Sequence, residues 1–190
     1  MFYKLLGSDD RKYLLKMAKL LVLCDKPLLW DGKPSNEIKT GTNLDVLSIV
    51  ESENEREIID ELEIFAGMTD GFGFRDMESS EQVHALLIEA LKEFPISMVE
   101  KPEVRLQAAS KVFKNIAGDR RFDIPTVPKA VLFELLMVAL GDGHVAGIKW
   151  TLLKDFQQHH KIDDFIFDDL LECAENLSKE RSKTVSIILE

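Results

Sequence analysis

Two Asp-Gly pairs are the residues of this 190-residue chain whose types and spacing most suggest chemistry. Asp31-Gly32 follows the apolar run 12–24, and Asp142-Gly143 follows the apolar run 129–141. Glycine accepts the positive φ of a sharp turn, so each pair places a carboxylate beside backbone groups that a helix end exposes. Two carboxylates, completed by carbonyl and water oxygens, can hold a divalent cation. Both pairs are therefore candidate cation ligands, with a plain turn as the competing interpretation.

The residues that follow the two pairs differ in charge. Asp31 has Glu37 and Glu55 downstream, and these carboxylates can complete a cation site. Asp142 is followed directly by Gly143 and then His144, whose imidazole can lie beside the carboxylate, but no acid follows closely. A structural turn is the favoured interpretation there. We expect any cation site to be stronger in the first half of the chain.

Signatures of catalysis are missing from the sequence. It contains no Gly-x-Ser-x-Gly, no phosphate-binding Gly-x-x-x-x-Gly-Lys, no His-Glu-x-x-His and no Cys-x-x-Cys. His159 and His160, followed by Asp163 and Asp164, can in principle collect a transition metal. The favoured interpretation is that the histidines complement a helix end and the two aspartates cap the next helix. We expect a protein that is not an enzyme.

Apolar residues recur with helical spacing along most of the chain and predict about seven helices. The runs 12–24 and 129–141 are apolar almost all round, which is typical of helices enclosed by neighbours, so we expect them to form a central pair. Residues 26–43 and 68–75 are predicted loops because they are rich in Gly, Pro and polar residues. Residues 44–50 fit a short helix or a strand, and 184–189 are β-prone in composition. No sheet is predicted from either segment.

Charge and composition exclude several classes of partner. The chain has 34 acidic and 24 basic residues, a formal net charge of −10, and no stripe of Lys and Arg. Nucleic acid and anionic membranes are therefore unexpected partners. The N-terminus lacks the features of a signal peptide, and no apolar segment is long enough to span a bilayer. Cys24 and Cys173 lie in helical patterns, where we expect small buried hydrophobic residues rather than a disulfide or a reactive thiol, so we expect a cytoplasmic protein.

The chain resembles the TerB-like family of tellurite-resistance proteins, which are all-helical and have two similar halves. The resemblance rests on an apolar helix that ends in Asp-Gly, here at Asp31-Gly32 and at 139–143. It extends through the helix that opens at 77–80, the helix that opens at Pro102 and the closing pair of helices over 149–177. It implies one domain over 1–190, with halves at about 9–94 and 102–178, a loop or insertion over 26–51 and a tail over 179–190.

The resemblance also implies site residues. In that family each Asp-Gly is followed by a helix-opening Glu, and the acids are implicated in binding a divalent metal. Asp31 and Asp142 match this pattern. The glutamate of the first half is Glu37 by distance, or Glu55 if residues 33–52 are an insertion. The corresponding position in the second half falls near Lys149, which would repel a cation.

Two hypotheses for the function follow. The first is a non-enzymatic cytoplasmic protein of the tellurite- or stress-resistance type, which binds a protein partner and, weakly, a divalent cation. The alternative is an acidic interaction or inhibitor module, such as an immunity protein that neutralises a basic partner.

Overall fold

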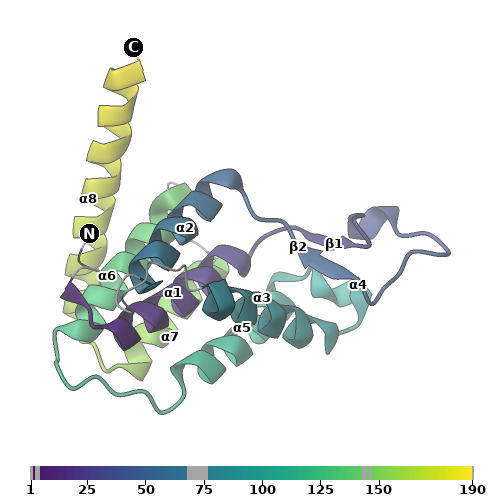
Figure 1. The fold of residues 1–190 in the computed structure, drawn as a ribbon, viewed down its shortest axis with the longest axis horizontal. Helices are drawn as coiled ribbons and strands as arrows, with labels where there is room; N and C mark the ends of the chain where they lie inside the picture. Colours follow the sequence, from purple (N-terminus) through teal and green to yellow (C-terminus); the bar gives the residue numbers. More distant parts are fainter. Residues whose placement is uncertain (1, 3–4, 68–76, 143–144, 146, 190) are drawn as a thin grey trace.

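Helices make up most of the computed structural model, which describes residues 2, 5–67, 77–142, 145 and 147–189 (Figure 1). That description excludes the side chains of residues 54, 55, 77–80 and 142. The helices are α1 (Ser8–Leu23), α2 (Glu53–Gly67), α3 (Met77–Lys92), α4 (Ile96–Val99), α5 (Pro102–Ala117), α6 (Val127–Ala139), α7 (Gly147–His159) and α8 (Asp164–Leu189), with short 3₁₀ helices at Ser35–Glu37 and Leu140–Asp142. The predicted all-α helical bundle is confirmed, with a small sheet of strands β1 (Leu28–Trp30) and β2 (Leu47–Ile49) added to it.

Proline and glycine mark the helix ends nearest the pocket described below. Pro102 is the first residue of α5 and Pro128 lies in the first turn of α6. The fixed φ of proline suits these positions, and its missing N–H costs nothing there. Gly118 has φ 48° and ends α5, because a residue without Cβ adopts this conformation with little strain. The predicted start of α5 at Pro102 is confirmed.

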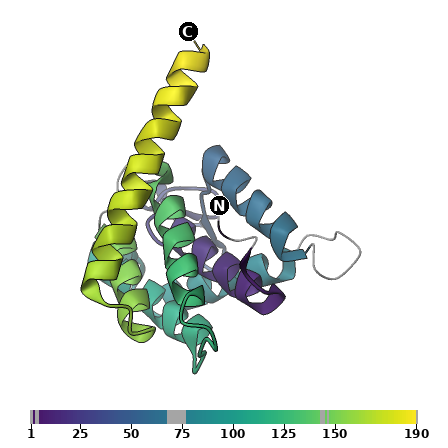
Figure 2. The ribbon, with the colours of Figure 1, turned by 90° about the vertical axis from the view of Figure 1, so that its left-hand side faces the viewer.

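Helices α1 and α6 form the centre of the bundle (Figure 2). Helix α1 packs against α2, α3, α5 and α6, while α6 also packs against α7 and α8. Both helices bury residues on nearly all sides, as the sequence predicts. Lys19 is the charged exception in α1, and its Nζ lies 2.7 Å from Glu51 Oε1, so the buried ammonium has a carboxylate partner.

Residues 25–50 form a projecting arm, in which the predicted loop joins two short strands and contains the 3₁₀ helix Ser35–Glu37 (Figure 1). Strands β1 and β2 pair antiparallel, with Leu28 opposite Ile49 and Trp30 opposite Leu47, and these four side chains are buried. Residues 44–50 therefore include a strand, and the expectation that no sheet forms is wrong. Three-residue strands are too short to give a clear alternating pattern, and burial of their apolar side chains stabilises the pair.

The base of the arm is anchored by a buried arginine of α5. Arg105 Nε donates to the carbonyl of Cys24 at 3.1 Å, and its Nη2 donates to the carbonyl of Lys26 at 2.5 Å. Burial lowers the pKa of Arg105, and the nearby Glu100 carboxylate opposes that shift. The first of these hydrogen bonds satisfies the carbonyl of the residue that caps α1, and the second satisfies a carbonyl at the start of the arm.

Helix α8 continues through the segment whose composition is β-prone. It runs to Leu189, and every residue from 179 to 189 is exposed (Figures 1 and 2). Extending an existing helix adds one hydrogen bond per residue without a new nucleus. The hydroxyls of Ser182 and Thr184 also donate to carbonyls four residues earlier, at 3.0 and 2.8 Å. No helix in the described part of the chain is long and apolar enough to cross a membrane.

The packing beneath the pocket can be tested at Phe156, a fully buried residue of α7. Its ring lies 6.3 Å from that of Tyr13 and 4.5 Å from that of His160. Replacing Phe156 by Ala removes this packing and leaves a cavity, so we expect a loss of about 3–5 kcal/mol in the free energy of unfolding, measured with urea. The control Leu189→Ala alters a side chain that is 81% exposed and should change stability by less than about 0.5 kcal/mol. A loss below about 1 kcal/mol for Phe156→Ala would contradict the packing described.

Candidate functional site

The predicted cation ligands of the first half lie on the arm. Asp31 follows β1 and has φ 51°, and Gly32 has φ 75°, so the pair forms a turn. Asp31 Oδ2 accepts a hydrogen bond from the backbone N–H of Asn43 at 3.4 Å. Glu37 is exposed in the short 3₁₀ helix that follows. Asp31 thus has a structural task in holding the arm, whether or not it also binds a cation.

The side chains of the remaining predicted ligands lie outside the described part of the structure. Glu55 lies in α2 and Asp142 in the second 3₁₀ helix, but their side chains, and all of His144, lie outside the described residues. Among the residues described, no group of three or more His, Cys, Asp or Glu side chains is arranged to hold a metal ion. Lys149 Nζ lies 3.6 Å from Asp25 Oδ2, so this lysine has an acidic partner inside the protein. The cation site stays a prediction.

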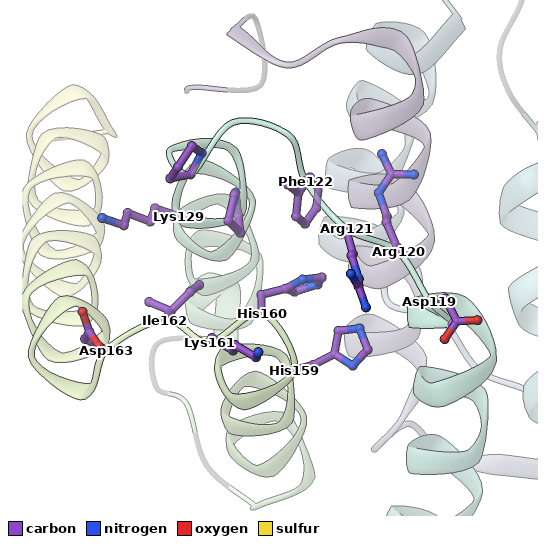
Figure 3. Close-up of a pocket in the computed structure, with 13 residues that line it drawn as sticks. Asp119, Arg120, Arg121, Phe122, Lys129, His159, His160, Lys161, Ile162 and Asp163 are labelled. Carbon is purple, nitrogen blue, oxygen red and sulfur yellow. The ribbon is translucent and has the colours of Figure 1, made fainter.

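A different group of side chains meets in a pocket of about 710 Å³ (Figure 3). The pocket lies where four helix ends come together: the ends of α5 and α7 and the beginnings of α6 and α8. Its lining combines four cations, two histidines and two carboxylates with Phe122, Ile162 and two prolines. The ionisable residues are Asp119, Arg120, Arg121, Lys129, His159, His160, Lys161 and Asp163.

Arg120 holds the loop that forms one wall of this pocket. Its Nη2 lies 2.5 Å from Asp10 Oδ1 of α1. Its guanidinium carbon lies 4.8 Å from the ring centre of Tyr13 and 5.1 Å from that of Phe122, in cation–π contact with both. In Figure 3 the Arg120 side chain points away from the histidines. Its charge is therefore neutralised by Asp10 and serves to fix the loop.

The other three cations are unpaired. In the described part of the chain, Arg121, Lys129 and Lys161 make no ion pair. Figure 3 shows the guanidinium of Arg121 reaching into the space between the rings of His159 and His160. An anion that enters the pocket therefore meets cationic side chains that have no acidic partner.

His160 lines the pocket, and its imidazole is neutral near pH 7. Its Nε2 shares a hydrogen bond of 2.9 Å with the Tyr13 hydroxyl, and its ring centre lies 4.9 Å from that of Phe122. Burial lowers the pKa of His160 to about 4, and the neighbouring charges of His159 and Arg120 act in the same direction. Burial also raises the pKa of Tyr13. Both partners of this hydrogen bond are therefore uncharged near neutral pH.

His159 and the two aspartates after it lie at helix ends, as the sequence suggests, but capping of α8 by the aspartate side chains is not among the hydrogen bonds of the described residues. Helix α7 ends at His159, and the carbonyl of Asp163 accepts the first backbone hydrogen bonds of α8 from Ile166 and Phe167, each at 3.1 Å. Asp164 Oδ1 accepts a hydrogen bond from Gln157 Nε2 at 2.8 Å. The pocket itself is not predicted from the sequence, because its cations come from segments about forty residues apart.

Comparison with family models, curated proteins and solved structures finds no match to this chain. The geometry of the pocket is therefore the basis of the functional argument.

The neutral state of His160 gives a test by pH. Because the pKa of His160 is about 4 in the folded chain and about 6.5 when unfolded, the unfolded state binds more protons between these values. Stability is therefore expected to fall as pH drops from about 6.5 to about 4. We expect His160→Gln to lose less stability than the wild type over this interval, measured by urea unfolding at pH 7.5, 5.5 and 4.5. Carboxylates titrate in both proteins, so the difference isolates His160, and equal slopes would contradict the assignment.

Proposed function

We propose that this protein is a non-catalytic helical binding protein and that it holds an anionic group in the pocket between α5, α6, α7 and α8. The observation that carries the proposal is the set of three unpaired cations, Arg121, Lys129 and Lys161, around one hollow. Such a group is unusual in a chain whose net charge is −10. The unpaired cations outnumber the two carboxylates of the same lining, Asp119 and Asp163, and an anion balances the excess.

The positions of the pocket carboxylates support this proposal. Figure 3 shows Asp119 at the end of α5, directed away from the histidines, and Asp163 on the opposite side, where α8 begins. Arg121 lies between them and offers a planar guanidinium with several N–H donors. Charge-assisted hydrogen bonds of this kind contribute about 1.5–3 kcal/mol each when they replace contacts with water.

Binding rather than catalysis is favoured by the residue types in the pocket. No Ser, Thr or Cys occurs among the described residues that line it, so none of them supplies a hydroxyl or thiol nucleophile. A lowered pKa can mark a general base. The Nε2 of His160, however, is already bonded to Tyr13, and the ring is packed against Phe122 and Phe156.

The same proposal includes the wider role that the sequence suggests. We propose a divergent TerB-like protein that works in the cytoplasm with a protein partner. The enclosed central pair α1 and α6, and the Asp-Gly turn at Asp31, support that resemblance. An acidic group of the partner, or a free anion, would occupy the pocket.

Titration calorimetry with sodium pyrophosphate at low ionic strength tests the proposal. We expect measurable binding that weakens as salt is added, because the attraction is between exposed charges. Arg121→Gln and Lys161→Gln should each weaken binding about tenfold, the loss that corresponds to about 1.4 kcal/mol. The matched control is Lys183→Gln, which removes an exposed cation of α8 and should leave the affinity unchanged.

Two results would overturn the proposal. One is the absence of pyrophosphate binding by a wild-type protein shown to be folded by circular dichroism. The other is equal weakening by Lys183→Gln and Arg121→Gln, since that would indicate attraction to overall charge rather than to the pocket.

A further inference from the structure

We infer that the pocket takes a phosphate ester of a planar aromatic group, such as an aryl phosphate or a nucleoside phosphate, with the phosphate at Arg121 and the ring against Phe122 and His160. This inference rests on the proposed anion-binding function and specifies the ligand of the same pocket.

The size of the pocket calls for an organic body beside the anion. Its volume of about 710 Å³ lies within the range of about 300–1,000 Å³ that is typical of small-molecule sites. Inorganic phosphate would fill only a small part of this space. Phe122, Pro125, Pro128 and Ile162 also line this space, so the body of the ligand meets some apolar surface beside the charged side chains.

The aromatic side chains of the pocket suit a planar group. Phe122 and His160 are both half-buried, with ring centres 4.9 Å apart. The Phe122 ring is also held at 5.6 Å from the Tyr13 ring and lies under Arg120. These contacts fix the wall before a ligand arrives, which reduces the entropy lost on binding. Stacking of a planar base or ring on an aromatic side chain adds to the affinity.

The number of hydrogen-bond donors around the pocket favours phosphate over carboxylate. A phosphate monoester carries a charge of about −1.5 to −2 at pH 7 and has three acceptor oxygens. A carboxylate has two acceptor oxygens, fewer than the donor side chains Arg121, Lys129 and Lys161 that line the pocket. The guanidinium of Arg121 can bind two phosphate oxygens at once. The exposed imidazole of His159, which faces Arg121 in Figure 3, offers a further N–H donor.

The test compares phenyl phosphate, butyl phosphate, benzoate and inorganic phosphate by titration calorimetry at pH 7.5. We expect phenyl phosphate to bind about tenfold more tightly than butyl phosphate, and more tightly than benzoate. Phe122→Leu should remove most of the preference for phenyl over butyl phosphate, and this ratio of affinities is the readout because Phe122 also packs against Arg120. Phe165→Leu is the matched control, because this phenylalanine of α8 is 62% exposed and does not line the pocket.

The outcomes separate this inference from the proposed function. Equal affinity for phenyl and butyl phosphate, with binding that still depends on Arg121, would overturn the aromatic part and leave the proposed function standing. Benzoate binding as tightly as phenyl phosphate would overturn the phosphate part. If neither these ligands nor pyrophosphate bind to the folded wild-type protein, the proposed function fails and the inference fails with it.

Discussion

The contact of Arg120 with α1 is the interaction on which the pocket depends. Asp10 and Tyr13 of α1 bind the guanidinium from one side, and Phe122 of the loop packs against it. This cation therefore connects the central helix to the segment that joins α5 to α6. With Arg120 directed toward α1, its neighbour Arg121 reaches the other side of the loop, where the two histidines at the end of α7 lie (Figure 3). The paired Arg120 thus positions the unpaired Arg121.

The helices are predicted well from the sequence because prolines mark where helices begin and continuous apolar runs mark the enclosed helices. Pro102 and Pro128 begin helices where their fixed φ is suited, and continuous apolar runs identify α1 and α6 as the enclosed pair. The arm is not predicted, since β1 and β2 have three residues each and their pairing joins segments almost twenty residues apart. The end of α8 is not predicted either, because local β propensity is outweighed by continuation of a helix that has already formed.

Charge gives the clearest example of what sequence reasoning misses. A net charge of −10 and the lack of a basic stripe argue against large polyanions such as nucleic acid. Neither the net charge nor the lack of a basic stripe gives the charge around the pocket. Arg121, Lys129 and Lys161 are separated along the chain and line one pocket only because four helix ends converge. The arginine pair at 120 and 121 is the local signal that was available. Arg120 pairs with Asp10 and fixes the loop, whereas Arg121 is unpaired and faces the histidines (Figure 3). Only the three-dimensional structure distinguishes these two roles.

Mapping the binding site by NMR tests the central claim most directly. Backbone amide shifts of the ¹⁵N-labelled protein would be recorded during titration with pyrophosphate. If the pocket holds the anion, the largest changes should fall in segments 118–129 and 159–163, which contain the residues that line it. Changes that centre on the arm around Asp31, or that spread evenly over exposed lysines, would contradict the account.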